Sequence, residues 1–78
     1  MRLSSLSKGA SGVVCKLNFD PAQSKLARRL LLMGIRPGVR IEVVGKAPLG
    51  DPVVVRVKNQ GFGLRKELLE LIEVQPCE

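Results

Sequence analysis

The chain has 78 residues, which is enough for one compact domain with a small core, so we expect a single domain over residues 1–78. Apolar residues make up 45% of the sequence but aromatic residues only 3%, which predicts a core of Val, Leu and Ile. The formal net charge is +6: residues 1–39 hold seven Lys/Arg and one acid, whereas residues 40–78 hold six of each, so the net positive charge lies in the first half.

Cysteine usage and hydropathy indicate the compartment. Cys15 and Cys77 are the only cysteines, and small secreted domains usually carry several disulfides. Residues 1–12 lack the apolar run of a signal peptide, and no stretch approaches the roughly 20 apolar residues of a membrane span. We therefore expect a soluble protein in a reducing, cytoplasmic environment.

The first predicted element is a strand from Val13 to Leu17, which follows two glycines. Strict alternation would place Val13, Cys15 and Leu17 on one face of this strand. We therefore expect Cys15 to point into the core as a small hydrophobic residue and Cys77 to be a free thiol in the C-terminal tail.

A helix is predicted over residues 21–33. Asp20 is suited to cap it, Pro21 fits its first position, and Gln23 stands where a capping-box side chain reaches back. Gly34 can end it in a left-handed conformation. The stripe expected to pack on the rest of the domain has i, i+4, i+7 spacing with two flanking residues: Leu26, Leu30, Met33, Ala27 and Leu31.

The opposite side of this helix is basic. Lys25, Arg28 and Arg29 follow i, i+3, i+4 spacing, and Leu32 falls beside Arg28 one turn later. An exposed leucine among arginines is unusual for a surface that only faces solvent.

The remainder of the chain reads as short strands joined by turns. The segment Ile35-Arg36-Pro37-Gly38 suits a type II turn before a strand that begins at Val39, and a loop over residues 46–52 leads to an alternating strand at residues 53–57. A turn is expected at residues 59–61, a strand at 62–64, a helical turn near 65–69, and a last strand with Ile72 and Val74 before a polar tail at 75–78. The fold class is mainly β, a small barrel of five to six short strands with one inserted helix.

The residues do not support catalysis or a bound cofactor. The chain has no His and no Tyr, so no serine has a base to activate it. Neither the two separated cysteines nor the scattered carboxylates show metal-ligand spacing, and the glycine pairs 9/12 and 61/63 do not match a phosphate-binding motif. We predict no enzyme, no metal site and no cofactor.

The basic helix side is either an ordinary solvated face or a docking surface. An acidic protein, a phosphate backbone or anionic lipid would each be attracted to it. Nucleic acid is disfavoured because Phe19 and Phe62 are the only aromatic residues and neither lies in a basic cluster. A small basic nucleic-acid-binding or regulatory module nevertheless remains the alternative.

Several segments of the chain follow one another in a specific order and spacing: Leu3–Leu6, Lys8–Gly9, Leu30–Gly38, Ile41–Val43, Ala47–Pro52, Leu64–Lys66 and Ile72–Val74. On these segments the sequence resembles the FeoA family from about residue 3 to residue 74. Each segment alone needs only ordinary turn chemistry, but the combination is specific.

This resemblance implies an SH3-like barrel and a non-catalytic accessory role in ferrous iron uptake beside FeoB, the membrane permease that carries a G-protein domain. Leu32 departs from the family pattern, because that position is commonly polar. We therefore predict that Lys25, Arg28, Arg29, Leu32 and Arg36 contact a cytoplasmic portion of the permease, which would bring the protein to the inner face of the membrane. Self-association through exposed barrel edges stays open, and the 46–52 loop is the next candidate surface.

Overall fold

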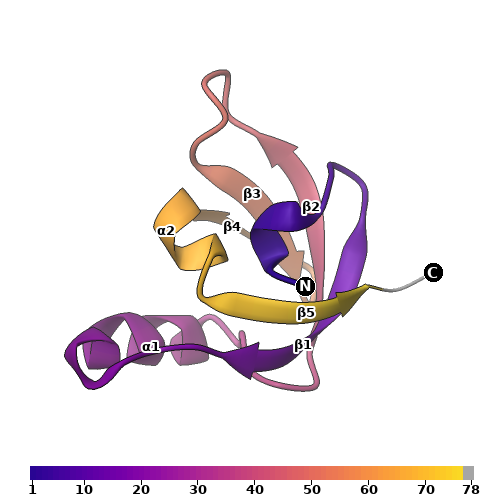
Figure 1. Cartoon of the computed structure of the whole chain (residues 1–78). Coiled ribbons are helices and arrows are strands. Elements are labelled where there is room, and N and C mark those ends of the chain that lie inside the picture. The colour runs from indigo at the N-terminus through magenta and orange to yellow at the C-terminus, as the bar shows by residue number, and fades with distance from the viewer. Residues whose placement is uncertain (77–78) are drawn as a thin grey trace.

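In the computed structural model, which describes residues 1–76, five short strands form one antiparallel sheet with a helix inserted after the first strand (Figure 1). The strands and helices are β1 (Ser11–Leu17), α1 (Ser24–Leu32), β2 (Arg40–Lys46), β3 (Val53–Val57), β4 (Gln60–Leu64), α2 (Lys66–Leu69) and β5 (Ile72–Pro76). Two 3₁₀ turns cover Leu3–Ser5 and Pro21–Gln23. The mainly β fold class and the inserted helix are therefore confirmed.

The sheet order is β4-β3-β2-β1-β5, and every pairing is antiparallel. The register shifts between Val14 and Lys16 in β1 and between Val43 and Gly45 in β2. Such irregularities increase local twist and bend a strand, which lets a short sheet wrap around its own core. Figure 1 shows the result, with β5 running across the direction of β2 and β3.

The core is aliphatic, as the composition predicts. No polar or charged residue among residues 1–76 is buried, and the two phenylalanines are only partly buried at its margin. The buried set draws on every strand, both helices and the N-terminal turn: Leu3, Leu6, Val14, Leu30, Ile35, Ile41, Val43, Val53, Val55, Val57, Leu64, Leu69, Ile72 and Val74.

The prediction that Cys15 lies in the core is wrong. Cys15 is exposed, and the buried residues of β1 are Gly12 and Val14. The register shift after Val14 breaks strict alternation, so Leu17, three positions along, packs partly against the core again. A pattern that assumes a regular strand assigns the wrong face when a bulge lies within it.

The start of the helix follows the expected capping chemistry. The Asp20 carboxylate accepts a hydrogen bond from the Ala22 backbone N–H at 2.9 Å, and the Gln23 side chain accepts one from the Asp20 backbone N–H at 3.0 Å. The first turn is 3₁₀, over Pro21–Gln23, and the α-helix proper runs from Ser24 to Leu32.

The helix ends at Gly34, whose φ is +84°. The Ile35 N–H bonds to the Leu30 carbonyl at 2.9 Å and the Gly34 N–H to the Leu31 carbonyl at 3.0 Å, which is the Schellman arrangement. Leu30 and Ile35 are both fully buried and seal this end. Leu31, which we expected to flank the packed stripe, is instead 54% exposed.

Several further boundaries differ from expectation, since β1 begins at Ser11 and not at Val13, and β2 begins at Arg40 and not at Val39. The turn between β3 and β4 consists of Lys58 and Asn59, both with positive φ, so Val57 pairs directly with Gln60 and the predicted turn at 59–61 begins one residue late. The last strand also continues through Gln75 and Pro76, which we had assigned to the polar tail. Cys77 lies outside the described residues.

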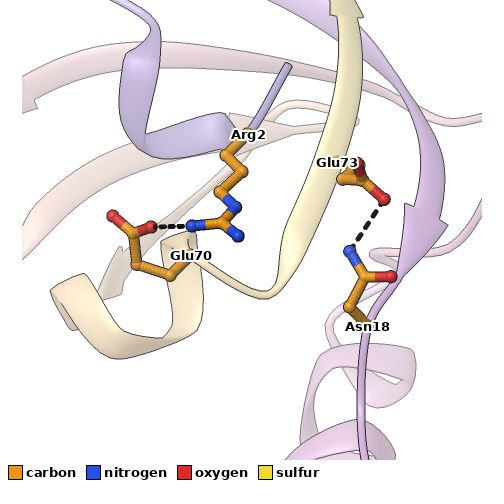
Figure 2. A network of polar contacts seen from close by, with 4 residues as sticks. All are labelled: Arg2, Asn18, Glu70 and Glu73. Atoms are coloured by element: carbon orange, nitrogen blue, oxygen red, sulfur yellow. Dashed lines mark hydrogen bonds and ion pairs between the residues drawn. The ribbon is translucent and has the colours of Figure 1, made fainter.

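The N-terminus and the C-terminal part of the chain are held together by polar contacts. Arg2 forms an ion pair with Glu70 at 3.0 Å, and the Asn18 amide donates to Glu73 at 2.8 Å (Figure 2). The Met1 carbonyl also accepts a hydrogen bond from the Val74 N–H at 2.7 Å. No helix among residues 1–76 is long and apolar enough to cross a membrane.

Candidate docking surface

Helix α1 stands at the margin of the sheet, beside the end of β1 and away from the β2–β3 loop (Figure 1). Only Leu30 of this helix is fully buried, and Leu26 and Ala27 are half-buried. A nine-residue helix that is anchored by one buried leucine and by its caps leaves most of its circumference open to solvent.

The predicted contact residues are all exposed. We call them the α1 face: Lys25, Arg28, Arg29 and Leu32 of the helix, together with Arg36 four residues after its last residue. Leu32 is 82% exposed, which leaves nearly its whole isobutyl group in water. Leu31 adjoins it, and the face therefore combines apolar surface with four cations.

The cations of the α1 face have no ion-pair partner within residues 1–76. The two ion pairs of that part of the chain are Arg2 with Glu70 at 3.0 Å and Arg56 with Glu42 at 3.6 Å. The only acid near α1 in sequence, Asp20, is engaged in the helix cap. The positive potential of this face is therefore directed outward, where it can attract an anionic partner.

Other parts of the surface do not assemble a chemical site. Within residues 1–76 no three His, Cys, Asp or Glu side chains converge as metal ligands. Hydrogen bonds from Ser4 and Arg2 hold the pKa of Glu70 below its ordinary value, and the Asn18 amide does the same for the pKa of Glu73. Both carboxylates thus favour the ionised form, in which they accept hydrogen bonds from Arg2 and Asn18, and they are not suited to act as proton donors.

The 46–52 loop carries the most exposed large apolar side chain, that of Leu49 at 96%. This loop also presents Pro48, which is exposed, and its base is closed by a 3.0 Å hydrogen bond from the Ala47 N–H to the Pro52 carbonyl. It lacks the cluster of cations found on α1.

Comparison with known proteins decides the family. The FeoA domain model matches residues 1–76. The chain belongs to the FeoA family. A relative from Porphyromonas gingivalis, a fusion of Fe(2+) transport protein A with the Fe(2+) transporter FeoB, is 37% identical over 75 residues, which is 96% of this chain and 8% of that protein.

Solved FeoA structures share the fold. Iron(II) transport protein A from Clostridium thermocellum is 39% identical with a TM-score of 0.88, over 97% of this chain and 45% of that one. FeoA from Stenotrophomonas maltophilia, described as a prokaryotic SH3 domain protein complexed with zinc, is 33% identical with a TM-score of 0.84, over 96% and 89%. The SH3-like fold and the non-catalytic character of a FeoA domain thus hold for this chain.

A manganese-dependent transcriptional repressor has the same fold in part of its chain. It gives a TM-score of 0.84 over 99% of this chain and 41% of the repressor, at 18% identity. This similarity concerns fold alone and carries no DNA-binding function to the FeoA domain.

Proposed function

We propose that this FeoA domain is a cytoplasmic accessory protein of ferrous iron uptake, and that it acts by docking its α1 face on the cytoplasmic portion of a FeoB-type permease. The observation that carries the proposal is the fused relative, in which a FeoA sequence and a ferrous iron transporter share one chain. The Stenotrophomonas relative is also described as a candidate ferrous iron transport activating factor.

In the fused relative the FeoA sequence and the transporter are covalently linked. Covalent linkage keeps two domains at a high effective concentration, so even a weak contact between them stays formed. A domain that is not linked must instead gain its affinity from exposed groups. Leu32 and the unpaired cations of α1 are suited to this, because a buried apolar anchor supplies affinity and charge supplies orientation and association rate.

The size of the expected effects follows from burial. Full burial of a leucine side chain contributes about 1.5–3 kcal/mol, so the Leu32→Ser variant should bind the permease portion roughly tenfold or more weakly. Arg28→Glu inverts one charge in the middle of the face and should mainly slow association. Neither change touches the core, because both side chains are exposed.

The experiment is a binding titration between the purified domain and the cytoplasmic portion of the cognate permease at physiological salt. Leu49→Ser and Lys8→Glu are matched controls, since they make the same leucine substitution and the same inversion of charge at exposed positions on other parts of the molecule. We expect the two α1 variants to bind weakly and the two controls to bind like the parent. Equal binding by all four would remove the α1 face from the proposal, and loss only in Leu49→Ser would move the contact to the 46–52 loop.

Nucleic acid is the competing partner, and the same titration includes it. Phe19 and Phe62 are both partly buried against the core, so neither is an open platform for stacking bases. Binding to a phosphate backbone weakens steeply as salt rises, whereas a contact anchored by leucine weakens less. Tight, salt-sensitive capture of nucleic acid with no capture of the permease portion would overturn the proposal.

A further inference from the structure

Strand β4 forms one margin of the sheet, and its outer side has no neighbouring strand in the described part of the chain. The other margin, β5, is covered in part by the first residues, because Arg2 bridges to Glu73 and the Met1 carbonyl binds the Val74 N–H. The two edges therefore differ, and β4 is the one that remains open.

The pairing register shows which backbone groups of β4 face outward. Val57 pairs with Gln60 next to the two-residue turn, and the pair flanking such a turn exchanges both backbone hydrogen bonds. Since bonded and non-bonded pairs alternate, Phe62 and Leu64 also bond to β3, whereas the N–H and C=O groups of Gly61 and Gly63 point away from it. Both glycines are exposed and carry no side chain that would screen these groups.

A groove accompanies this edge at the end of β4 near α1. It has a volume of about 190 Å³ and is lined by Leu26, Arg29, Gly63, Arg65, Glu67 and Leu68. The two leucines are half-buried and supply an apolar wall. The charged residues of the lining are two arginines and one glutamate, so its net charge is positive. At the other end of β4 the exposed Lys58 occupies the turn.

We propose that the open edge of β4 binds an extended acidic segment of a partner protein, which adds a strand beside Gly61 and Gly63 and places an apolar side chain against Leu26 and Leu68. Main-chain hydrogen bonds would give the affinity, while the groove and the arginines would select the segment. The inference goes beyond the proposed function, since β4 would take such a segment whether or not α1 docks on a permease.

A second copy of this chain is a poorer occupant of the same edge. Pairing two β4 strands would bring Arg29, Arg65 and Lys58 of one copy toward the same cations of the other, in a molecule whose net charge is already +6. Like charges at close range oppose association, and an acidic segment removes that opposition.

The test uses the isotope-labelled domain and a short synthetic peptide in which glutamate and valine alternate, with a lysine and valine peptide as control. We expect only the acidic peptide to shift the Gly61 and Gly63 amide resonances and to slow their hydrogen exchange. Gly61→Pro removes an outward N–H that makes no hydrogen bond to β3, so it should weaken peptide binding about tenfold while the pairing of β3 with β4 remains. Gly61→Ala keeps this N–H and should bind the peptide like the parent.

Several results would overturn the inference. Equal binding of both peptides, equal binding by Gly61→Pro, or peptide-induced shifts centred on another element would each do so. Shifts of the β4 amides with protein concentration alone would assign the edge to a second copy. If Gly61→Pro does not fold, Arg65→Glu provides an independent test, because it should weaken the acidic peptide while leaving the strand intact. Arg29 belongs both to the groove and to the α1 face, so it is left unchanged, and the variants alter only Gly61 and Arg65.

Discussion

Two leucines of α1, two positions apart, should respond in opposite ways to the same substitution. Leu30 is fully buried and Leu32 is 82% exposed. Leu30→Ala removes a packed side chain and should lower the free energy of unfolding by about 2–5 kcal/mol. Leu32→Ala should change it by no more than about 0.5 kcal/mol, because it removes surface already in water.

The assay is equilibrium unfolding in urea, followed at several protein concentrations. A domain of this size has a total stability of about 4–12 kcal/mol, so Leu30→Ala could leave too little folded protein to measure. Ile35→Val gives a milder test of the same contact, since Ile35 is also fully buried and closes the helix end with Leu30. It should cost about 0.5–1.5 kcal/mol.

A large loss of stability in Leu32→Ala would refute the reasoning. It would mean that the Leu32 side chain is covered in the folded state, either by the domain itself or by a second copy. The two cases differ in one respect, because only the second makes the unfolding midpoint depend on protein concentration. Either result would show that the α1 face is not free to dock.

Three other predictions concern the scaffold. Gly12→Ala would place a Cβ 3.0 Å from a backbone oxygen of β5 and should lower the free energy of unfolding by about 1–3 kcal/mol. The Cβ of Gly45→Ala would have no atom within 4 Å, so this variant should unfold at nearly the same urea concentration as the parent. Asp20→Ala removes the cap of the first helical turn and should cost about 1 kcal/mol in the same assay. The folded protein lowers the pKa of Glu70 and of Glu73, so the stability that these carboxylates add is present above about pH 4.5 and is lost as the pH falls further. Replacing both by Gln should therefore make the free energy of unfolding depend less on pH below about pH 4.5.

The helix and the turns could be predicted because their chemistry is local. Asp20, Gln23 and Gly34 act on backbone groups within a few residues, so their order in the sequence is enough to locate the two ends of the helix. The alternation of β3 was also predicted, since no bulge interrupts Val53–Val57.

The faces of β1 could not be predicted in the same way. The irregularity after Val14 depends on pairing with β5, almost sixty residues away, and it turns Cys15 outward. The open edge of β4 is another non-local property, because Gly61 and Gly63 read only as turn or bulge residues until the strand order is known. Exposure of Leu32 was predicted from its place among arginines, whereas its role in docking stays a prediction.

Ferrous iron uptake tests the central proposal most directly. Cells that lack this chain would receive the parent, the double variant Arg28→Glu/Leu32→Ser, or the matched double variant Lys8→Glu/Leu49→Ser, each at equal abundance, and the initial rate of ferrous iron entry would be measured. We predict that the parent and the matched control restore uptake and that the α1 variant does not. Full restoration by the α1 variant would contradict docking through this face, and no restoration by the parent would contradict a role in ferrous iron uptake.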